Sequence, residues 1–271
     1  MTENSKVILA VLDGLNYQTA RDCMGHLQAL CAEGTGCLYK LQSELPSMSR
    51  PLYECLLTGV KPVHSGVVHN KVVRLSRCQS IFSLARAQGR VTAASAYHWV
   101  SELYNHAPFD LVQDRIVNDE SKNIQHGVFY QWDDYPDEAV IADGEMLRRR
   151  YNPDFLLIHP MNIDDTGHHF GVDSAQYRNK TRSVDIYLSY YLQDWLDAGY
   201  QVIITADHGM NNDGTHGGIL ECERAVPCYV FGSAFSKKAD VSFPQTAMCG
   251  LVCELLGLEH QKELPQGVLH D

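Results

Sequence analysis

The sequence predicts a three-layer α/β fold with a mostly parallel central sheet. Short, continuous apolar runs have the length of buried strands, and longer stretches between them carry apolar residues at helical spacing. Strands that alternate with helices pair in parallel through right-handed crossovers. The chain has 271 residues, of which 45% are hydrophobic, and this length is sufficient to bury a core. We therefore expect one domain over residues 1–271.

The first half of the chain predicts two strands and two helices. Residues 7–12 form a β-branched run, too short for a helix, that ends at Asp13-Gly14. Residues 18–32 have the apolar spacing of a helix. Residues 80–88 predict a second helix that stops at Gly89 and leads into a buried strand over residues 91–96.

The second half predicts two further strands, each preceded by a helix. Residues 138–151 form the first of these helices, before a strand over residues 155–158. Residues 173–197 predict a long amphipathic helix, closed by Gly199 before a strand over residues 201–205. The pattern ends in a helix over residues 246–256.

One segment fits neither pattern. Residues 110–137 are rich in acidic and aromatic side chains and include the run FYQWDDYPDE. We expect this segment to form a small excursion over the functional site.

The charge and cysteine content exclude several classes of protein. The 22 Lys and Arg residues face 33 Asp and Glu residues, and the net charge of −11 opposes binding to duplex nucleic acid or to anionic membranes. No apolar run approaches the ~20 residues of a membrane span, and the first residues do not resemble a signal peptide. The nine cysteines are scattered without a CxxC pair, which favours a reduced, cytoplasmic protein. A homodimer is one option for its assembly.

Four polar segments lie near the expected strand ends, where ligands bind in parallel α/β sheets. They are LDG at 12–14, PSMSRPLYECLLTG at 46–59, IDDTGHHFG at 163–171 and ADHGMNNDGTHGG at 206–218. Buried carboxylates and imidazoles need compensation, and metal ions supply it. Mixed Asp and His ligation suits zinc, with manganese or iron as alternatives. The candidate ligands are Asp13, Asp164, His168, Asp207, His208 and His216, and we expect Gly167 to let the chain turn between Asp164 and His168.

The order of these motifs resembles the alkaline phosphatase superfamily, in particular its nucleotide pyrophosphatase/phosphodiesterase branch. The resemblance extends from Asp13 to the last helix and implies two divalent ions, usually zinc with manganese as an option, above an alkaline phosphatase-like sheet. It implies one metal site of Asp13, Ser49, Asp207 and His208, and another of Asp164, His168 and His216.

The resemblance also identifies a nucleophile. The family segment reads roughly P-T-x-T-x-P-N-H-x-x-L-x-T-G, and its matches in this chain include Pro46, Pro51 and Gly59. This alignment makes Ser49 the nucleophile, with Ser47 as the alternative. Pro51 suits the first turn of a helix through Leu57, so Ser49 would lie at its positive end. The segment HSGVVHN resembles the one whose asparagine contacts a phosphoryl oxygen, which assigns that role to Asn70.

The chain departs from the family at several substrate-facing positions. Serine replaces the usual threonine nucleophile, which preserves the hydroxyl. Arg50 follows it where an aromatic residue is frequent, and Leu52-Tyr53 replace Asn-His. Arg50 is therefore a candidate for gripping a second negative group, with a solvated surface position as the alternative. Tyr97 is a candidate for the leaving-group side, with core packing as the alternative; His159 is not expected to be a ligand.

These observations predict a two-metal phosphoric ester hydrolase that attacks small anionic phosphate esters through a covalent phosphoseryl intermediate. A phosphodiester is the preferred substrate. The alternative on the same scaffold is a phosphomonoesterase or a phosphonate hydrolase of the phosphonoacetate type. A phosphomutase would need a large second domain, for which the chain has no room. A non-catalytic metal-binding protein is the alternative from another class.

Overall fold

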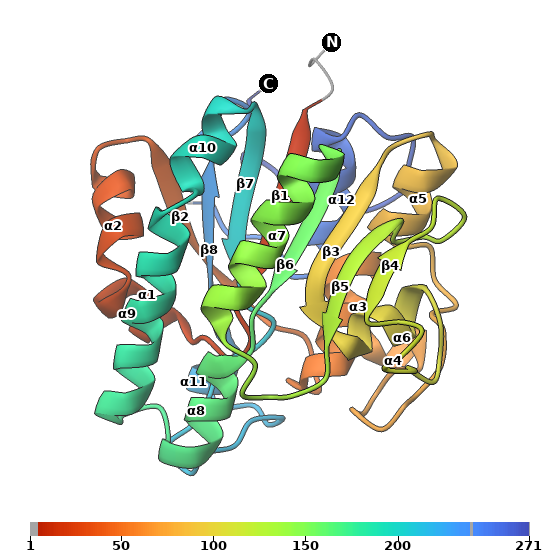
Figure 1. The fold of residues 1–271 in the computed structure, drawn as a ribbon. Coiled ribbons are helices and arrows are strands. Elements are labelled where there is room, and N and C mark those ends of the chain that lie inside the picture. Colours follow the sequence, from red (N-terminus) through yellow and green to blue (C-terminus); the bar gives the residue numbers. More distant parts are fainter. Residues whose placement is uncertain (1–4, 239–240, 271) are drawn as a thin grey trace.

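An eight-stranded sheet runs through the middle of the molecule, in the spatial order β2-β8-β7-β1-β6-β3-β5-β4 (Figure 1). The computed structural model describes residues 5–238 and 241–270. The strands are β1 (Lys6–Val11), β2 (Gly36–Gln42), β3 (Thr92–Tyr97), β4 (Ile116–Asn118), β5 (His126–Tyr130), β6 (Phe155–His159), β7 (Tyr200–Thr205) and β8 (Ala225–Phe231).

The centre of the sheet is parallel and its edges are antiparallel. β7, β1, β6, β3 and β5 pair in parallel, and Ile8 of β1 lies opposite Leu156 of β6 and Val202 of β7. β8 pairs antiparallel with β7 and β2, and β4 pairs antiparallel with β5. The central strands are covered on both faces, so their side chains are buried almost throughout rather than alternating between buried and exposed. The carboxyl ends of the five parallel strands therefore meet at one edge, the lower edge in Figure 1.

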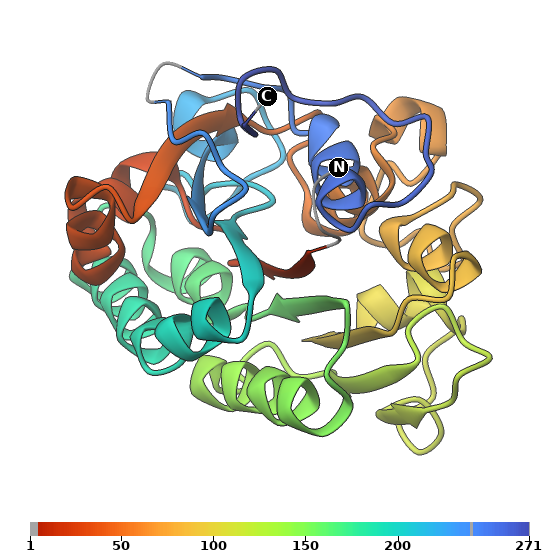
Figure 2. The same cartoon turned by 90° about the horizontal axis from the view of Figure 1, so that it is seen from above.

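Helices cover both faces of the sheet (Figures 1 and 2). One face carries α1 (Tyr17–Cys23), α2 (Gly25–Ala32), α7 (Asp137–Tyr151), α9 (Ala175–Ser189) and α10 (Leu192–Asp197). The other carries α3 (Ser49–Thr58), α5 (Ile81–Ala87), α6 (His98–Tyr104) and α12 (Ala247–Leu255). The short helices α4 (Pro62–Ser65) and α11 (Glu221–Arg224) and the longer α8 (Asn162–Phe170) lie toward the carboxyl edge.

The predicted three-layer architecture and its four central strands are confirmed, with differences at the periphery. The helix expected over 18–32 is two helices that meet at Met24, and the one expected over 173–197 breaks at Tyr190-Tyr191. Residues 110–137 contain β4 and β5, so part of the segment expected as an excursion over the site extends the sheet. β4 and β5 were not predicted as strands, nor were β2 and β8, of which β2 is an edge and β8 lies between β2 and β7.

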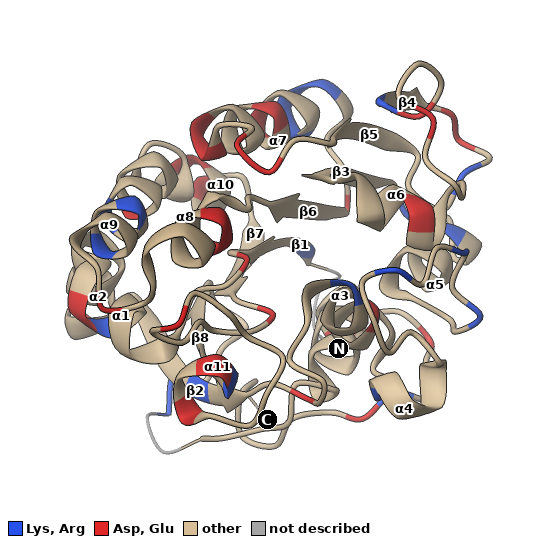
Figure 3. Ribbon diagram, turned by 90° about the horizontal axis from the view of Figure 1, so that it is seen from below, with Lys and Arg blue, Asp and Glu red and all other residues tan. Residues whose placement is uncertain are grey.

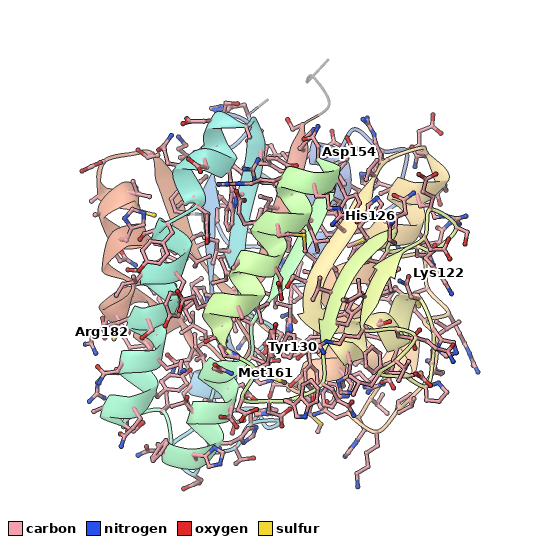
Figure 4. All side chains as sticks on the ribbon, viewed as in Figure 1. Lys122, His126, Tyr130, Asp154, Met161 and Arg182 are labelled. Atoms are coloured by element: carbon pink, nitrogen blue, oxygen red, sulfur yellow. The ribbon has the colours of Figure 1, made fainter. Side chains whose placement is uncertain are left out.

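Side chains from both layers meet in one hydrophobic core cluster around the sheet. Figure 4 labels Asp154 at the amino end of β6, Tyr130 at the carboxyl end of β5 and Met161 just beyond β6. Among the residues that the structure describes, none of the helices combines the length and apolar content needed to cross a membrane.

Candidate metal centre and nucleophile

Asp13 lies two residues beyond β1, at the carboxyl edge of the sheet, and its side chain is fully buried. The next residue is Gly14, with a φ of +73°; a Cβ there would lie 2.8 Å from Asp164 Cα. Glycine therefore permits both this left-handed turn and the close approach of the chain to Asp164. The result is that two of the expected ligands, 151 positions apart in sequence, are neighbours.

Asp207 and His208 follow β7, the strand next to β1, and both are fully buried. The amide N–H of Gly14 donates to Asp207 Oδ1 over 3.2 Å. His208 Nδ1 lies 2.8 Å from the carbonyl oxygen of Gly209. A carbonyl only accepts, so Nδ1 carries the hydrogen and Nε2 keeps a free lone pair. That Nε2 lies 3.3 Å from Asp207 Oδ2 and 3.4 Å from Asp13 Oδ1.

Asp164 and His168 project from one face of α8, four residues apart, with Asp164 Oδ2 3.2 Å from His168 Nε2. Gly167 is not a turn residue as expected, since it lies inside this helix, where a Cβ would meet Met210 at 2.7 Å. His216 comes from the long loop after β7, and its Nε2 is 3.7 Å from Asp164 Oδ1.

Among the residues that the structure describes, two groups of side chains have the spacing of metal ligands. The first is Asp13, Asp207 and His208; the second is Asp164, His208 and His216. His208 belongs to both, and its ring stacks on that of His216 with centroids 3.7 Å apart. His168 lies at the margin, in contact with Asp164 but 43% exposed. The structure thus brings all six predicted ligands to one place.

Burial dominates the electrostatics of this cluster. It raises the pKa of Asp13 and Asp207 well above their usual range, with the neighbouring carboxylates adding to the effect. It lowers the pKa of His208 to about 3, with His216 contributing in the same direction. The hydrogen bond to Asp164 raises the pKa of His168 to about 9. Without a cation, these acids are held together at a high electrostatic cost.

Ser49 is the first residue of α3, and its hydroxyl points into this cluster. Its Oγ lies 3.0 Å from His208 Nε2, and the residue is 2% exposed. The helix continues through Thr58, so the expected helix through Leu57 is confirmed. Ser47 is committed elsewhere, because its hydroxyl donates to the carbonyl of Gly218 over 2.9 Å. The carbonyl oxygen of Ser47 lies 2.8 Å from His216 Nδ1, but of the two hydroxyls it is that of Ser49 that contacts a candidate ligand.

Asn70 lies beside the amino end of α3. Its Oδ1 accepts a hydrogen bond from the backbone N–H of Arg50 over 3.1 Å, and the side chain is half-buried. This bond fixes the orientation of the amide, because the carbonyl oxygen faces the helix and the NH₂ group is directed away from that bond. The residue predicted to contact a phosphoryl oxygen thus adjoins the residue after Ser49.

The expected substrate contact by Arg50 is wrong. Arg50 is 1% exposed, and its Nη2 forms an ion pair with Glu102 Oε2 at 2.6 Å. Nη1 donates to the carbonyl of Val72, and the guanidinium lies 4.6 Å from the centroid of Trp99. The residue after the nucleophile points into the helix layer because successive helical side chains face different directions.

Tyr97 also differs from its expected role on the leaving-group side. It is 6% exposed at the end of β3, and its hydroxyl donates to Asp133 Oδ1 over 2.7 Å. Its ring packs edge-on against Trp99 and Tyr130. Core packing, the alternative interpretation, describes this residue.

Two residues near the cluster were missed from the sequence. The hydroxyl of Tyr53, on α3, donates to Asp13 Oδ2, and His159, the last residue of β6, has its Nε2 3.4 Å from the same oxygen. Burial lowers the pKa of His159 to about 4. Both residues are buried, with Tyr53 2% exposed and His159 1% exposed. The position of His159 at a strand end was the available signal, and Tyr53 had none beyond its departure from the family pattern.

Acidic residues lie on α8 and on the loop before α7 (Figure 3). Burial raises the pKa of the Asp165 carboxyl, and the nearby charges of Asp133, Asp164 and Asp134 act in the same direction.

The chain matches the family model of type I phosphodiesterases and nucleotide pyrophosphatases over residues 7–218. It is 22% identical over 277 residues to the catalytic subunit of human GPI ethanolamine phosphate transferase 2, covering 96% of this chain and 27% of the relative. It is 34% identical over 90 residues to GPI ethanolamine phosphate transferase 3 of Saccharomyces cerevisiae, covering 32% of this chain and 8% of that protein. The chain thus spans about a quarter of the length of the human relative.

Solved structures show the same fold. Murine ectonucleotide pyrophosphatase/phosphodiesterase 5 superposes with a TM-score of 0.77 at 15% identity, covering 98% of this chain and all of the other. A sulfatase from Bacteroides thetaiotaomicron gives 0.69 at 15% identity, with 96% and 72% covered. Phosphonoacetate hydrolase from Sinorhizobium meliloti gives 0.55 at 21% identity, with 76% and 56% covered. The fold is that of the alkaline phosphatase superfamily.

Proposed function

Because this chain belongs to the type I phosphodiesterase/nucleotide pyrophosphatase family and is an enzyme acting on phosphoesters, we propose that it hydrolyses phosphodiesters with Ser49 as nucleophile and two divalent cations as cofactors. One observation carries the proposal. Ser49 Oγ lies 3.0 Å from Nε2 of His208, the residue that both groups of candidate ligands share.

The ligand set fits two cations. Asp13 Oδ1, Asp164 Oδ1 and Asp207 Oδ2 are buried and have no hydrogen-bond partner among the described residues, an arrangement that is costly unless a positive charge compensates it. Asp13, Asp207, His208 and Ser49 would hold one ion, and Asp164, His168 and His216 the other. Their mixed oxygen and nitrogen donors favour zinc, with manganese as the alternative.

Bound ions would lower the pKa of the Ser49 hydroxyl and offset negative charge on the phosphoryl oxygens. The chain's own residues would then carry two displacements. Ser49 Oγ attacks phosphorus, the P–O bond to the leaving group breaks, and the phosphoryl group stays on the serine. Water then attacks the same phosphorus, the P–O bond to Ser49 breaks, a phosphate monoester leaves with the second substituent of the diester, and a proton from the water restores the Ser49 hydroxyl.

Asn70 would stabilise the phosphoryl group during both displacements. Its Oδ1 is held by the Arg50 N–H, so the donor end of the amide is available to a non-bridging oxygen. The first N–H groups of α3 add the positive end of a ten-residue helix beside the same position. These donors carry no net charge, which suits a diester with a single negative charge.

The diester is preferred over a monoester or phosphonate because of Arg50. That guanidinium was the cation considered for a second negative group, and it is committed to Glu102 and Val72 inside the protein. A monoester or phosphonate hydrolase stays the alternative, and a non-catalytic metal-binding protein is disfavoured by the family assignment.

A second candidate concerns the substituent on the phosphate. The curated relatives are named as ethanolamine phosphate transferases, and Asp133, Asp134 and Asp165 lie beside the ligand cluster. Carboxylates there would favour an aminoalkyl group, which is a cation at neutral pH. In a transferase, an acceptor hydroxyl would replace water in the second displacement.

We also propose that the protein works in a reducing compartment such as the cytoplasm. All nine cysteines are free thiols, and six of them are buried, which supports an environment without disulfide formation. A homodimer stays a prediction.

The decisive test is hydrolysis of bis(p-nitrophenyl) phosphate against p-nitrophenyl phosphate, with zinc or manganese, by the wild type and by Ser49→Ala. We expect the diester to be the better substrate, and Ser49→Ala to abolish turnover while elemental analysis still finds the ion at Asp164, His168 and His216. With the diester as substrate, acid quenching followed by mass spectrometry should find a p-nitrophenyl phosphoryl group on Ser49, because only one p-nitrophenolate leaves in the first displacement. Turnover by Ser49→Ala at the wild-type rate would assign the attack to Ser47 or to water. Ser101→Ala, a buried serine on α6 away from the cluster, is the matched control and should leave the rate unchanged.

A further inference from the structure

The two carboxylate oxygens of Asp13 have different neighbours. Oδ1 faces His208 Nε2 at 3.4 Å and has no hydrogen-bond partner among the described residues. Oδ2 accepts from the hydroxyl of Tyr53 and lies 3.4 Å from His159 Nε2. One oxygen is therefore held by the protein, and the other is directed into the ligand cluster.

The two residues around Oδ2 come from different layers of the fold. Tyr53 is on α3, one helical turn after Ser49, so both side chains lie on the same face of that helix. His159 ends β6, the strand that pairs with β1. The rings of Tyr53 and His159 pack edge-on with centroids 4.5 Å apart, which fixes each against the other.

Both residues around Asp13 Oδ2 are buried away from water. Tyr53 is 2% exposed and His159 1%, and neither ring nitrogen of His159 has a hydrogen-bond partner among the described residues. An imidazole buried without partners is costly, and the carboxylate oxygen Asp13 Oδ2, 3.4 Å from Nε2, can offset part of that cost. The backbone of His159 is itself fixed, since its carbonyl accepts from the Tyr130 hydroxyl over 2.7 Å.

We propose that Tyr53 and His159 are positioning residues that clamp Asp13 through Oδ2, and so set the direction of Oδ1 toward the metal ion held with Asp207 and His208. This inference rests on the proposed function, because it presumes that the ion binds there. The clamp also links the nucleophile to the ligand, since the helix that begins with Ser49 carries the hydroxyl that holds Asp13. Groups that orient ligating carboxylates typically contribute 10–100-fold to metal affinity.

The test measures zinc affinity by competition with a chromophoric chelator, which reports metal binding independently of turnover. The wild type should bind two zinc ions per chain. Tyr53→Phe removes only the hydroxyl and should weaken one of the two ions by about 10–100-fold, leaving the other unchanged. His159→Gln should weaken the same ion, and cobalt loaded into either variant should show an altered visible absorption spectrum.

The matched control is Tyr104→Phe. Tyr104 is another buried tyrosine, and its hydroxyl lies 3.3 Å from the buried carboxylate of Glu54, away from the cluster. This control should lose stability like Tyr53→Phe but keep both zinc affinities within about twofold.

Two outcomes contradict the inference in different ways. If the wild type binds no zinc or manganese, the proposed function itself fails. If the wild type binds two ions and both folded variants retain its affinities, the ions bind without help from Tyr53 and His159, and only the clamp is refuted. Should Tyr53→Phe not fold, His159→Gln alone decides by the same measurement.

Discussion

Removing Glu102 should destabilise the protein strongly, because Arg50 would be left as an uncompensated buried charge. The two side chains are 1% and 5% exposed, with Nη2 and Oε2 2.6 Å apart. The other oxygen of Glu102 accepts from the backbone N–H of Phe109 over 2.9 Å. Burial lowers the pKa of Arg50 and Glu102 raises it, so the carboxylate is what makes the buried guanidinium tolerable.

The expected magnitude follows from this burial. Breaking a buried ion pair by removing one partner costs about 3–5 kcal/mol. For a chain of this length, that corresponds to a fall in Tm of roughly 6–10 °C. The double variant Arg50→Met/Glu102→Leu should recover most of the loss, because apolar side chains of similar volume often replace a buried pair at little cost.

Urea unfolding of the wild type, Glu102→Leu, Arg50→Met and the double variant measures the coupling free energy directly. We expect the loss in the Glu102 variant to exceed that in the double variant by about 2 kcal/mol or more. A loss below about 1 kcal/mol in Glu102→Leu, together with a raised KM for p-nitrophenyl phosphate in Arg50→Met, would return Arg50 to a role in substrate binding.

Two further predictions concern the site. Asn70→Ala should lower kcat for bis(p-nitrophenyl) phosphate by about 10²–10³, the usual effect of removing one transition-state donor, with metal content by elemental analysis unchanged; a wild-type kcat would exclude Asn70 from the reaction. In the metal-free protein, burial raises the pKa of Asp13 and Asp207, and the bond to Asp164 raises that of His168 to about 9. His208 and His159 have lowered pKa values and favour the opposite trend near pH 7, but at about pH 8–9 unfolded histidines are already neutral. There His168 of the folded protein still holds its proton, so Tm measured in chelator should fall as pH rises across this window. Zinc should raise Tm and weaken this dependence, and a Tm that rises with pH in chelator would contradict the assigned charges.

Four of the five central parallel strands could be predicted because they are short, mostly apolar runs that are buried almost throughout. The strands on the antiparallel sides of the sheet gave no such signal. β2 alternates buried and exposed side chains (GCLYKLQ), and β8 contains Pro227, a residue that counts against a strand unless it lies near an edge. β4 spans three residues and depends on its pairing with β5, which local sequence does not encode.

The candidate ligands could be predicted for a related reason. In a parallel sheet, every carboxyl end reaches the same edge, so Asp13 after β1 and Asp207 after β7 are neighbours whatever the connecting chain does. For a residue on a helix, by contrast, the position in the sequence does not determine which neighbour the side chain faces. Ser49 and Arg50 are adjacent in sequence, yet one faces His208 and the other faces Glu102, and only the packing of α3 decides which.

The same reasoning explains why Tyr53 and His159 escaped prediction. A ligand is recognisable because its residue type suits a metal, but a residue that orients a ligand needs only a hydrogen-bonding atom and the right neighbour. Tyr53 reaches Asp13 across 40 positions and His159 reaches it across 146, so neither pairing has a local pattern. What identifies both is a property of the folded state, the buried carboxylate oxygen Oδ2 that must be satisfied. Departures from a family pattern at buried positions near a site, such as Leu52-Tyr53 here, are therefore places to look for such partners.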